Sequence, residues 1–342
     1  MRCVFTYSLV FVTLLFISGC SNSATGTLSA VQAIQGWTMG TTYHIKYVAH
    51  EDLSASMQAD VDSALLELNQ TMSTYIVDSE LNRLNAHAVG DWMSVSRPLF
   101  TVIKRALELS RLSSGAFDIS VGPLVDLWGF GPTPGSERVP ERQALELAKQ
   151  KVGYQAIELD ETQLRIRKSA PRRLDLSAIA KGYGVDMIAV LLEQQGINDY
   201  LVEIGGEIRL KGKKPNGELW RIAIEAPVSN QREAMKVLPL SNHALATSGD
   251  YRNYFEVDGK RYSHTIDPVS GYPIRHTLVS ATVISDNCMD ADGWATTMMV
   301  LGVEPSLVLA EQQQLAVLLL EKTATGFTEH KSSAFSKYLI EP

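Results

Sequence analysis

Helix-like and strand-like segments alternate irregularly along this chain, and several of the strands come in adjacent pairs. The segments 156–160 and 163–168 are typical of a hairpin, and 200–212 and 220–226 are two further strands in succession. A parallel sheet needs long crossovers and therefore a regular strand–helix alternation. That rhythm is missing, and no G-x-G-x-x-G follows a predicted strand. We therefore predict an α+β fold, with a mostly antiparallel sheet packed with helices in a single continuous globule.

The helices are predicted from apolar residues spaced three and four apart and from signals at their ends. Ser96 is a predicted N-cap, Pro98 follows it in the first turn, and Gly115 is a predicted stop. The predicted helices are 57–72, 97–114, 140–153, 177–196, 289–301 and one that opens at Pro305, and the remaining predicted strands are 42–48, 316–321 and 337–341.

The first nineteen residues have the pattern of a secretory signal peptide. Arg2 is the only charged residue before Cys20, and an apolar run from Val4 to Phe16 follows it. Such a run is too short to remain as a membrane-spanning helix. Small residues directly precede Cys20, in a pattern that resembles a bacterial lipobox. We expect cleavage before Cys20 and lipidation of its thiol; the alternative is an ordinary signal peptide with a coincidental cysteine.

The signal peptide, residues 1–19, fixes how the rest of the chain divides. Residues 20–34 are polar and predict a flexible tether, and residues 35–342 predict one folded domain. Cys288 is the only cysteine of that domain, so we expect no internal disulfide and a buried thiol. The formal net charge of −7 argues against nucleic acid as a partner, because nucleic acid needs a basic face. No later stretch is long enough to cross a membrane.

The segment "CMDADGWATTMMVLG", residues 288–302, places two hard oxygen ligands on one helix face. Asp292 and Thr296 are four residues apart, which puts their side chains one turn apart on the same side. A carboxylate and a hydroxyl suit Mg²⁺, which takes few protein ligands and keeps waters or phosphate oxygens. The alternative is that Asp290 and Asp292 cap the helix and Thr296 only packs. Spacing alone favours this alternative.

The segment "LDLSAIAKGYGVD", residues 174–186, surrounds a predicted helix start. Helix N-termini attract anions, so Lys181 could meet a phosphate and Asp175 could hold a hydroxyl or a ring edge. The alternative is an ordinary amphipathic helix, capped by Ser177, with Lys181 in solvent. This segment is weak evidence when it is taken alone.

Two glycine-rich segments could approach a ligand closely. The loop "SGAFDISVGPLVDLWGFG", residues 114–131, could sandwich a flat heteroaromatic ring, although Trp128 and Phe130 could simply pack on the core. Gly205 and Gly206 lie inside the predicted strand 200–212, where paired glycines mark a bulge or a close backbone approach.

The segment "YSHTIDPVSGYP", residues 262–273, gathers a Ser, a His and an Asp. Ser263, His264 and Asp267 are too close in sequence for an ordinary triad. We predict that Ser263 and Asp267 shape the turn, and His264 could serve as a general base, since histidine titrates near neutrality. A loop histidine that bonds the backbone is the alternative. Cys/His clusters, G-x-S-x-G and Walker A sequences are missing, which argues against zinc, α/β-hydrolase and P-loop chemistry.

Together these segments resemble the ApbE family of FAD:protein FMN transferases. The motifs that carry the resemblance occur in the family's order and span nearly the whole chain: "ISGC", "MGTTY", "MSTYIVDSELNRLN", "SGAFDIS", "DLSAIAKGYGVD", "EIGGEIR", "ATSGDYRNYF", "YSHTIDPVSGYP" and "DADGWATTMMVLG". The resemblance implies that the chain binds FAD and Mg²⁺, splits the pyrophosphate, moves FMN onto a Thr or Ser hydroxyl of a partner protein, and releases AMP. It implies acceptors such as subunits of the Na⁺-translocating NADH:quinone reductase and related electron-transfer complexes.

The resemblance also implies roles for individual residues. Asp292, Thr296 and the backbone carbonyl of Ala178 match the family's metal ligands. His264 matches the histidine of its motif, which implies that His264 is the catalytic base. The positions that match flavin-nucleotide contacts are Met39, Tyr75, Ala116, Phe117, Asp118, Asp175, Lys181 and Ile266. An aromatic residue at Tyr75 resembles the transferases more than the relatives that hydrolyse FAD.

Two other functions compete with FMN transfer. One is an Mg²⁺-dependent FAD pyrophosphatase that yields FMN and AMP, and the other is an FAD-binding lipoprotein without catalysis. FAD carries its own phosphoanhydride, so transfer needs no ATP and suits a site outside the cytoplasm. We expect the chain at the periplasmic side of the bacterial inner membrane, anchored through Cys20, with the outer membrane as the alternative.

Overall fold

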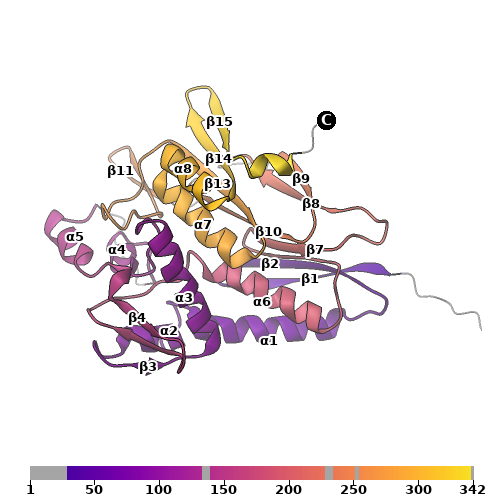
Figure 1. Ribbon diagram of the computed structural model, residues 1–342, viewed down its shortest axis with the longest axis horizontal. Coiled ribbons are helices and arrows are strands. Elements are labelled where there is room, and N and C mark those ends of the chain that lie inside the picture. The colour runs from indigo at the N-terminus through magenta and orange to yellow at the C-terminus, as the bar shows by residue number, and fades with distance from the viewer. Residues whose placement is uncertain (1–28, 133–138, 228–233, 251–253, 340–342) are drawn as a thin grey trace, which may run out of the picture.

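An eight-stranded antiparallel sheet forms the centre of the protein in the computed structural model (Figure 1). The structure describes residues 29–132, 139–227, 234–250 and 254–339. The strand order is β1-β2-β6-β7-β10-β13-β14-β15, and every neighbouring pair is antiparallel. Smaller sheets are formed by β3-β5-β4, β8-β9 and β11-β12. The predicted α+β class with a mostly antiparallel sheet is confirmed.

The elements have the following bounds. The strands are β1 (Ala30–Thr38), β2 (Thr41–Ala49), β3 (Met93–Ser94), β4 (Ile157–Asp160), β5 (Arg165–Lys168), β6 (Tyr200–Ile204), β7 (Glu207–Lys211), β8 (Trp220–Glu225), β9 (Ala234–Leu240), β10 (His243–Gly249), β11 (Tyr254–Val257), β12 (Lys260–Ser263), β13 (Leu278–Ser285), β14 (Ala316–Thr323) and β15 (Gly326–Lys331). The helices are α1 (Ser54–Met72), α2 (Glu80–Ala86), α3 (Arg97–Leu112), α4 (Gly122–Leu127), α5 (Arg142–Lys149), α6 (Ala180–Gln194), α7 (Cys288–Leu301) and α8 (Val303–Gln313), with short 3₁₀ helices η1 (Tyr154–Ala156) and η2 (Phe335–Tyr338).

Helices α1, α6 and α7 cover one face of the main sheet. Along β2, the side chains of Tyr43, Ile45 and Tyr47 are fully buried, while His44 and Lys46 between them are exposed. This alternation follows from the two-residue period of a strand, which turns every second side chain toward the helices. The face that meets α1 and α6 is therefore a continuous apolar layer.

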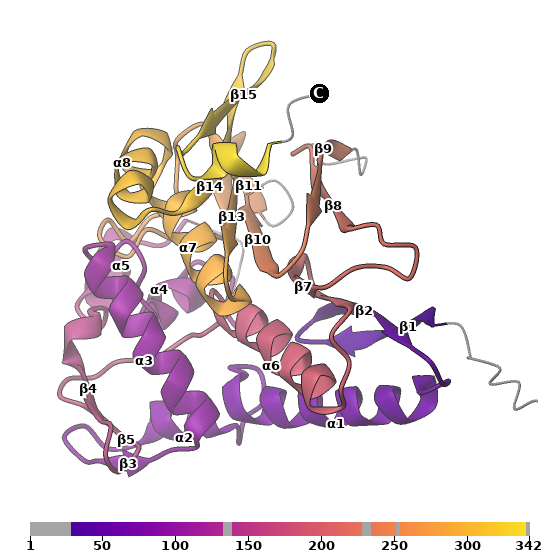
Figure 2. The same cartoon turned by 45° about the vertical axis from the view of Figure 1, so that its right-hand side comes forward.

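Strands β10 and β13 are covered on both faces. Helix α7 packs on one side, and the β8–β9 ribbon lies on the opposite side, where Trp220 and Phe335 join the apolar layer (Figure 2). Burial on both faces explains why β13 is buried along nearly its whole length and reads as an apolar run without alternation. Helices α2 to α5 and the β3–β5–β4 sheet lie together beside the helical face (Figure 1).

Several predicted elements are confirmed with shifted ends. The Ser96 hydroxyl accepts the amide N–H of Leu99, which caps α3 as expected, and the hairpin β4–β5 is present. The predicted tether is wrong at its end, because Ala30 already begins β1 and residues 30–34 pair with β2. Cys20 and the predicted signal peptide lie outside the described residues, among which no helix is long and apolar enough to span a bilayer.

Three local predictions are wrong. Gly205 and Gly206 do not sit in one strand: both have positive φ (62° and 106°) and form the turn that joins β6 to β7. Ser177 does not cap a helix, because α6 begins at Ala180 and its N-cap residue makes no side-chain bond. The segment predicted as a last strand, 337–341, enters the 3₁₀ helix η2, and its final two residues lie outside the described part.

Helices α6 and α7 approach so closely at Gly182 that no side chain fits between them. A Cβ atom at Gly182 would lie 2.3 Å from the carbonyl oxygen of Cys288 and 2.8 Å from the Cβ of Asp292. Backbone atoms cannot move aside as the end of a flexible side chain can. The absence of a side chain at Gly182 therefore sets the distance between the two helices.

We expect Gly182→Ala to lower the free energy of unfolding by about 3 kcal/mol, the upper part of the range for overpacking a core. The matched control is Gly184→Ala on the same helix, whose Cβ would meet only side-chain ends, the nearest being Leu68 Cδ2 at 3.0 Å. Urea denaturation of both variants measures the difference. Equal and small losses would contradict the assigned role of Gly182.

Candidate active site

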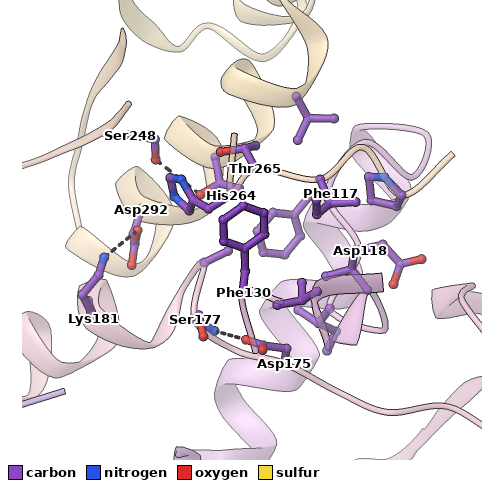
Figure 3. Close-up of a pocket in the computed structure, with 18 of the residues that line it drawn as sticks. Phe117, Asp118, Phe130, Asp175, Ser177, Lys181, Ser248, His264, Thr265 and Asp292 are labelled. Carbon is purple, nitrogen blue, oxygen red and sulfur yellow. Dashed lines mark hydrogen bonds and ion pairs between the residues drawn. The ribbon is translucent and has the colours of Figure 1, made fainter. Parts of the chain in front are cut away.

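A cavity of about 450 Å³ opens where the main sheet, α6 and α7 meet the loops around α4 and after β12 (Figure 3). The turn between β6 and β7 and the end of β10 form its floor, and the first turn of α6 and one face of α7 form a wall. The segments 116–130 and 264–268 close the remaining sides. Most segments singled out from the sequence therefore meet at one place.

Asp292 and Thr296 lie on the face of α7 that lines the cavity, as their spacing predicts. The Asp292 side chain is almost fully buried, and its Oδ2 accepts the backbone N–H of Gly182 at 2.9 Å. Thr296 Oγ1 lies 3.3 Å from the hydroxyl oxygen of Ser248. Two oxygen atoms that could bind a metal ion, one anionic and one neutral, are thus held one turn apart at the cavity wall.

Asp290, the other acidic residue at the start of α7, has a different role. Its carboxylate pairs with the Arg105 side chain of α3, with Nε at 2.6 Å from Oδ1 and Nη2 at 3.1 Å from Oδ2. Asn287 caps the helix by accepting the backbone N–H of Asp290. The alternative that Asp290 and Asp292 cap the helix is therefore wrong.

Lys181 projects from the first turn of α6 toward two carboxylates. Its Nζ lies 2.7 Å from Glu207 Oε1 and 3.7 Å from Asp292 Oδ1 (Figure 3). Burial alone would lower the pKa of Lys181, but the two carboxylates raise it well above the usual value, so the ammonium stays charged. The alternative of a solvent-exposed lysine is wrong.

Glu207 was not identified from the sequence. It begins β7 directly after the Gly205–Gly206 turn, lines the cavity, and is only 4% exposed. Burial raises the pKa of its carboxyl, Asp292 raises it further, and Lys181 opposes both. Among the described residues, Oε2 has no hydrogen-bond partner. The sequence signal that could have identified it is a charged residue at an inward-facing position of a predicted strand with apolar neighbours.

The site could hold a divalent cation, but with few protein ligands. The described residues contain no group of three or more His, Cys, Asp or Glu side chains with metal-binding geometry. The carboxyl groups of Asp292 and Glu207 both lie beside the Lys181 ammonium. Two hard oxygens on α7 fit Mg²⁺, which typically completes its shell with water and phosphate.

Helix α7 is held in place by a buried acid at its N-terminus. The Asp186 carboxylate of α6 accepts the backbone N–H groups of Cys288 and Met289, each at 2.9 Å, and pairs with Arg209 at 2.9 Å. An acid at a helix N-terminus satisfies amides that have no partner within the helix. Cys288 is fully buried as predicted, and burial raises the pKa of its thiol well above the usual value.

The segment that carries His264 is shaped by its own polar side chains. Ser263 Oγ accepts the backbone N–H of Thr265, and the Asp267 carboxylate accepts those of Val269 and Ser270. The prediction that Ser263 and Asp267 shape the turn is confirmed. Figure 3 places the His264 imidazole on the same side of the cavity as Asp292.

Trp128 anchors this segment by a hydrogen bond and by ring stacking. Its Nε1–H donates to the carbonyl oxygen of Gly271 at 2.9 Å, and its ring stacks on Tyr262 with 5.5 Å between centroids. Trp128 is fully buried, whereas Phe130 lines the cavity and meets the His264 ring edge-on, with 6.3 Å between centroids. The predicted aromatic loop therefore divides into a packing residue and a cavity wall.

The structure brings most of the predicted nucleotide contacts to the cavity. Those that line it are Tyr75, Ala116, Phe117, Asp118, Asp175, Lys181 and Ile266, together with the predicted metal ligand Ala178. Tyr75 lies at the rim and is 66% exposed. Partial burial raises the pKa of its phenol, and the nearby carboxylates of Asp175 and Asp126 raise it further. Met39 does not line the cavity: it occupies the β1–β2 turn with φ 48° and packs against the core.

The two acids on the loop side act mainly on their own backbone. Asp118 Oδ1 accepts from the amide and hydroxyl of Ser120, and Oδ2 accepts the amide N–H of Tyr154. Burial raises the pKa of the Asp118 carboxyl, and these hydrogen bonds oppose the rise. Asp175 Oδ1 accepts the N–H of Ser177 at 2.8 Å. Both acids therefore shape the walls of the cavity.

Comparison with known proteins connects this cavity to a family. The model of the ApbE family matches residues 39–319. The FAD:protein FMN transferase of Vibrio cholerae is 46% identical over 95% of this chain and 96% of its own length. Two solved structures are similar: the flavin transferase ApbE from Vibrio cholerae (TM-score 0.84, 45% identity, 91% of this chain and 100% of that one) and the apo flavinyl transferase ApbE of Pseudomonas stutzeri (TM-score 0.83, 40% identity, 91% and 97%).

The hydrogen bond from Trp128 to Gly271 predicts a local effect that a matched variant isolates. Trp128→Phe keeps a smaller aromatic ring and removes the donor. The lost hydrogen bond alone should lower the free energy of unfolding by about 1–2 kcal/mol and speed hydrogen exchange at the amides of residues 267–274. Trp220→Phe is the control, because the Trp220 indole also donates to a carbonyl at 2.9 Å, that of Lys211, away from the cavity. Unchanged exchange in Trp128→Phe would contradict the assignment.

Proposed function

The chain belongs to the ApbE family, and we propose that it transfers the FMN part of FAD to a Thr or Ser hydroxyl of a partner protein. The acceptor oxygen forms a bond to the phosphorus of the FMN phosphate, and the anhydride bond to the AMP phosphate breaks. AMP leaves with the bridging oxygen, and the proton of the acceptor hydroxyl goes to a base. The products are an FMN phosphoester on the partner protein and AMP.

One observation carries the proposal. His264, a candidate base, and Asp292 with Thr296, candidate cation ligands, line the same cavity. Phosphoryl transfer depends mainly on positioning and on charge neutralisation, so a base and a cation site must flank the same phosphate. The cavity volume of about 450 Å³ lies within the usual range of small-molecule sites.

In this proposal His264 is the proton acceptor. Ser263 and Asp267 shape the turn that carries His264, and Trp128 anchors the turn through its hydrogen bond to Gly271. These contacts hold the imidazole in place at the cavity. Phe117 and Phe130 offer apolar faces for the flavin ring. Lys181 and the first turn of α6 supply positive charge for the pyrophosphate.

The residues that would hold Mg²⁺ are Asp292, Thr296 and the carbonyl of Ala178. They fit such a group, because a buried carboxylate and a hydroxyl face the cavity beside Glu207, whose Oε2 lacks a hydrogen-bond partner among the described residues. When bound, Mg²⁺ neutralises charge on the phosphate oxygens. Asp292 keeps its orientation through the Gly182 amide, which is independent of the ligand.

The proposal extends to the acceptor and to the location of the chain. Subunits of the Na⁺-translocating NADH:quinone reductase and related electron-transfer complexes are the proposed acceptors, through the family resemblance. The lipobox-like pattern before Cys20 supports a lipid anchor at the periplasmic side of the bacterial inner membrane. Tyr75 at the cavity rim favours transfer over hydrolysis to FMN and AMP, since the family's transferases carry an aromatic residue at this position.

We expect His264→Ala to lower the rate of FMN transfer by about 10²–10⁴-fold, the usual loss of a general base, while FAD affinity stays close to the parent value. Single-turnover transfer assays and FAD titration measure the two quantities. His44→Ala, on the opposite face of the sheet, is the control and should transfer at the parent rate. A His264→Ala protein that binds FAD and transfers normally would exclude His264 as the base.

We expect Asp292→Ala to abolish metal-dependent release of AMP, because it removes the only anionic ligand of the proposed cation. The control is Asp290→Asn on the same helix, whose carboxylate pairs with Arg105 away from the cavity. It should release AMP with the metal dependence of the parent. Chromatography of AMP formed at increasing Mg²⁺ measures both variants, and unchanged release in Asp292→Ala would place the cation elsewhere.

A further inference from the structure

Glu207 has a carboxylate that the protein only half satisfies. Oε1 lies 2.7 Å from Lys181 Nζ, whereas Oε2 has no hydrogen-bond partner among the described residues. The side chain is 4% exposed and lines the cavity. A buried acceptor left without a hydrogen bond is unfavourable, because it has lost its water and gained no partner. The arrangement therefore indicates that Oε2 receives its hydrogen bond from something bound in the cavity.

The partner of Oε2 must be a donor next to the cation site. Phosphate oxygens are poor partners for an ionised carboxylate, because two anionic groups repel each other. Lys181 Nζ lies 2.7 Å from Glu207 and 3.7 Å from Asp292, so the two carboxylates flank the same ammonium. A water molecule bound to Mg²⁺ is a strongly polarised donor, and Mg²⁺ typically keeps several such waters.

Direct coordination by Glu207 fits less well. The part of the chain that the structure describes holds no group of three or more acidic, His or Cys side chains arranged for a metal. The Lys181 ammonium already occupies Oε1 of Glu207. Oε2 is left to act through an intervening water.

We propose that Glu207 is a positioning residue of the cation site: Oε1 holds Lys181, and Oε2 accepts a hydrogen bond from a water bound to Mg²⁺. The inference rests on the proposed function, since it takes the cation to lie at Asp292 and Thr296. It adds to those ligands a residue that orients the water shell. It also explains why a charged residue occupies a buried position at the start of β7.

Binding of Mn²⁺, a spectroscopic substitute for Mg²⁺, tests this inference without any reaction. The parent chain is titrated with Mn²⁺ without FAD, and free Mn²⁺ is followed by electron paramagnetic resonance. Glu207→Gln should raise the Kd for Mn²⁺ by about 10–100-fold, the usual effect of losing an outer-shell partner. Glu203→Gln is the matched control: it lies on the same hairpin, bonds His44 and the Gly206 amide, and should bind as the parent does.

A double variant separates the water from the lysine. If Glu207 acts through Oε2, then Lys181→Met with Glu207→Gln binds Mn²⁺ about tenfold or more weakly than Lys181→Met alone. If Glu207 acts only by holding Lys181 away from Asp292, those two proteins bind equally, and the inference is overturned. Parent-like binding by Glu207→Gln alone overturns it too. Should Glu207→Gln unfold, Glu207→Asp keeps the charge but shortens its reach and should also bind more weakly.

Asp292→Ala distinguishes failure of this inference from failure of the proposed function. If Asp292→Ala binds Mn²⁺ as tightly as the parent, the cation is not at α7, and both the proposed site and this inference fall. If Asp292→Ala loses Mn²⁺ and Glu207→Gln keeps it, only the role of Glu207 falls. Loss of Mn²⁺ in both, with thermal unfolding midpoints near that of the parent, supports the inference.

Discussion

The close contact between α6 and α7 at Gly182 is the constraint on which the candidate site depends. The Gly182 amide donates to Asp292, and the next residue toward the N-terminus, Lys181, reaches the same carboxylate and Glu207. Asp186, one turn later on α6, satisfies the first amides of α7. One helix therefore positions both the start and the acidic residue of the other. A single side chain at position 182 would separate the lysine, the acid and the helix end together.

The second half of the site rests on a turn that belongs to no helix or strand of the main sheet. His264 follows β12, and its direction is set by side chains within a few residues and by the buried Trp128. This turn meets the end of β10 and one face of α7 at the same cavity. Phosphoryl transfer needs such preset parts, since its catalysis consists mainly of position and charge. The packed helix pair holds the candidate cation ligands, and the hydrogen-bonded turn holds the candidate proton acceptor.

Local signals in the sequence predicted many of the parts but not how they are arranged. Spacing placed Asp292 and Thr296 on one face, and turn chemistry assigned Ser263 and Asp267, because both depend on residues within one turn. Sequence could not separate Asp290 from Asp292, since the difference is made by Arg105 on a distant helix. It missed Glu207 and took the two glycines before it for part of a strand, because a hairpin turn and a bulge share the same residues. Motif resemblance, rather than periodicity, joined the segments into one site.

The reaction proposed for this cavity moves FMN from FAD onto a partner protein. Intact-protein and peptide mass spectrometry of an acceptor subunit, after incubation with this chain, FAD and Mg²⁺, tests it most directly. Transfer predicts one added FMN on a peptide with a Thr or Ser residue and one AMP formed for each FMN attached. An acceptor of unchanged mass, beside free FMN and AMP, would contradict it and identify a hydrolase, and intact FAD would identify a carrier.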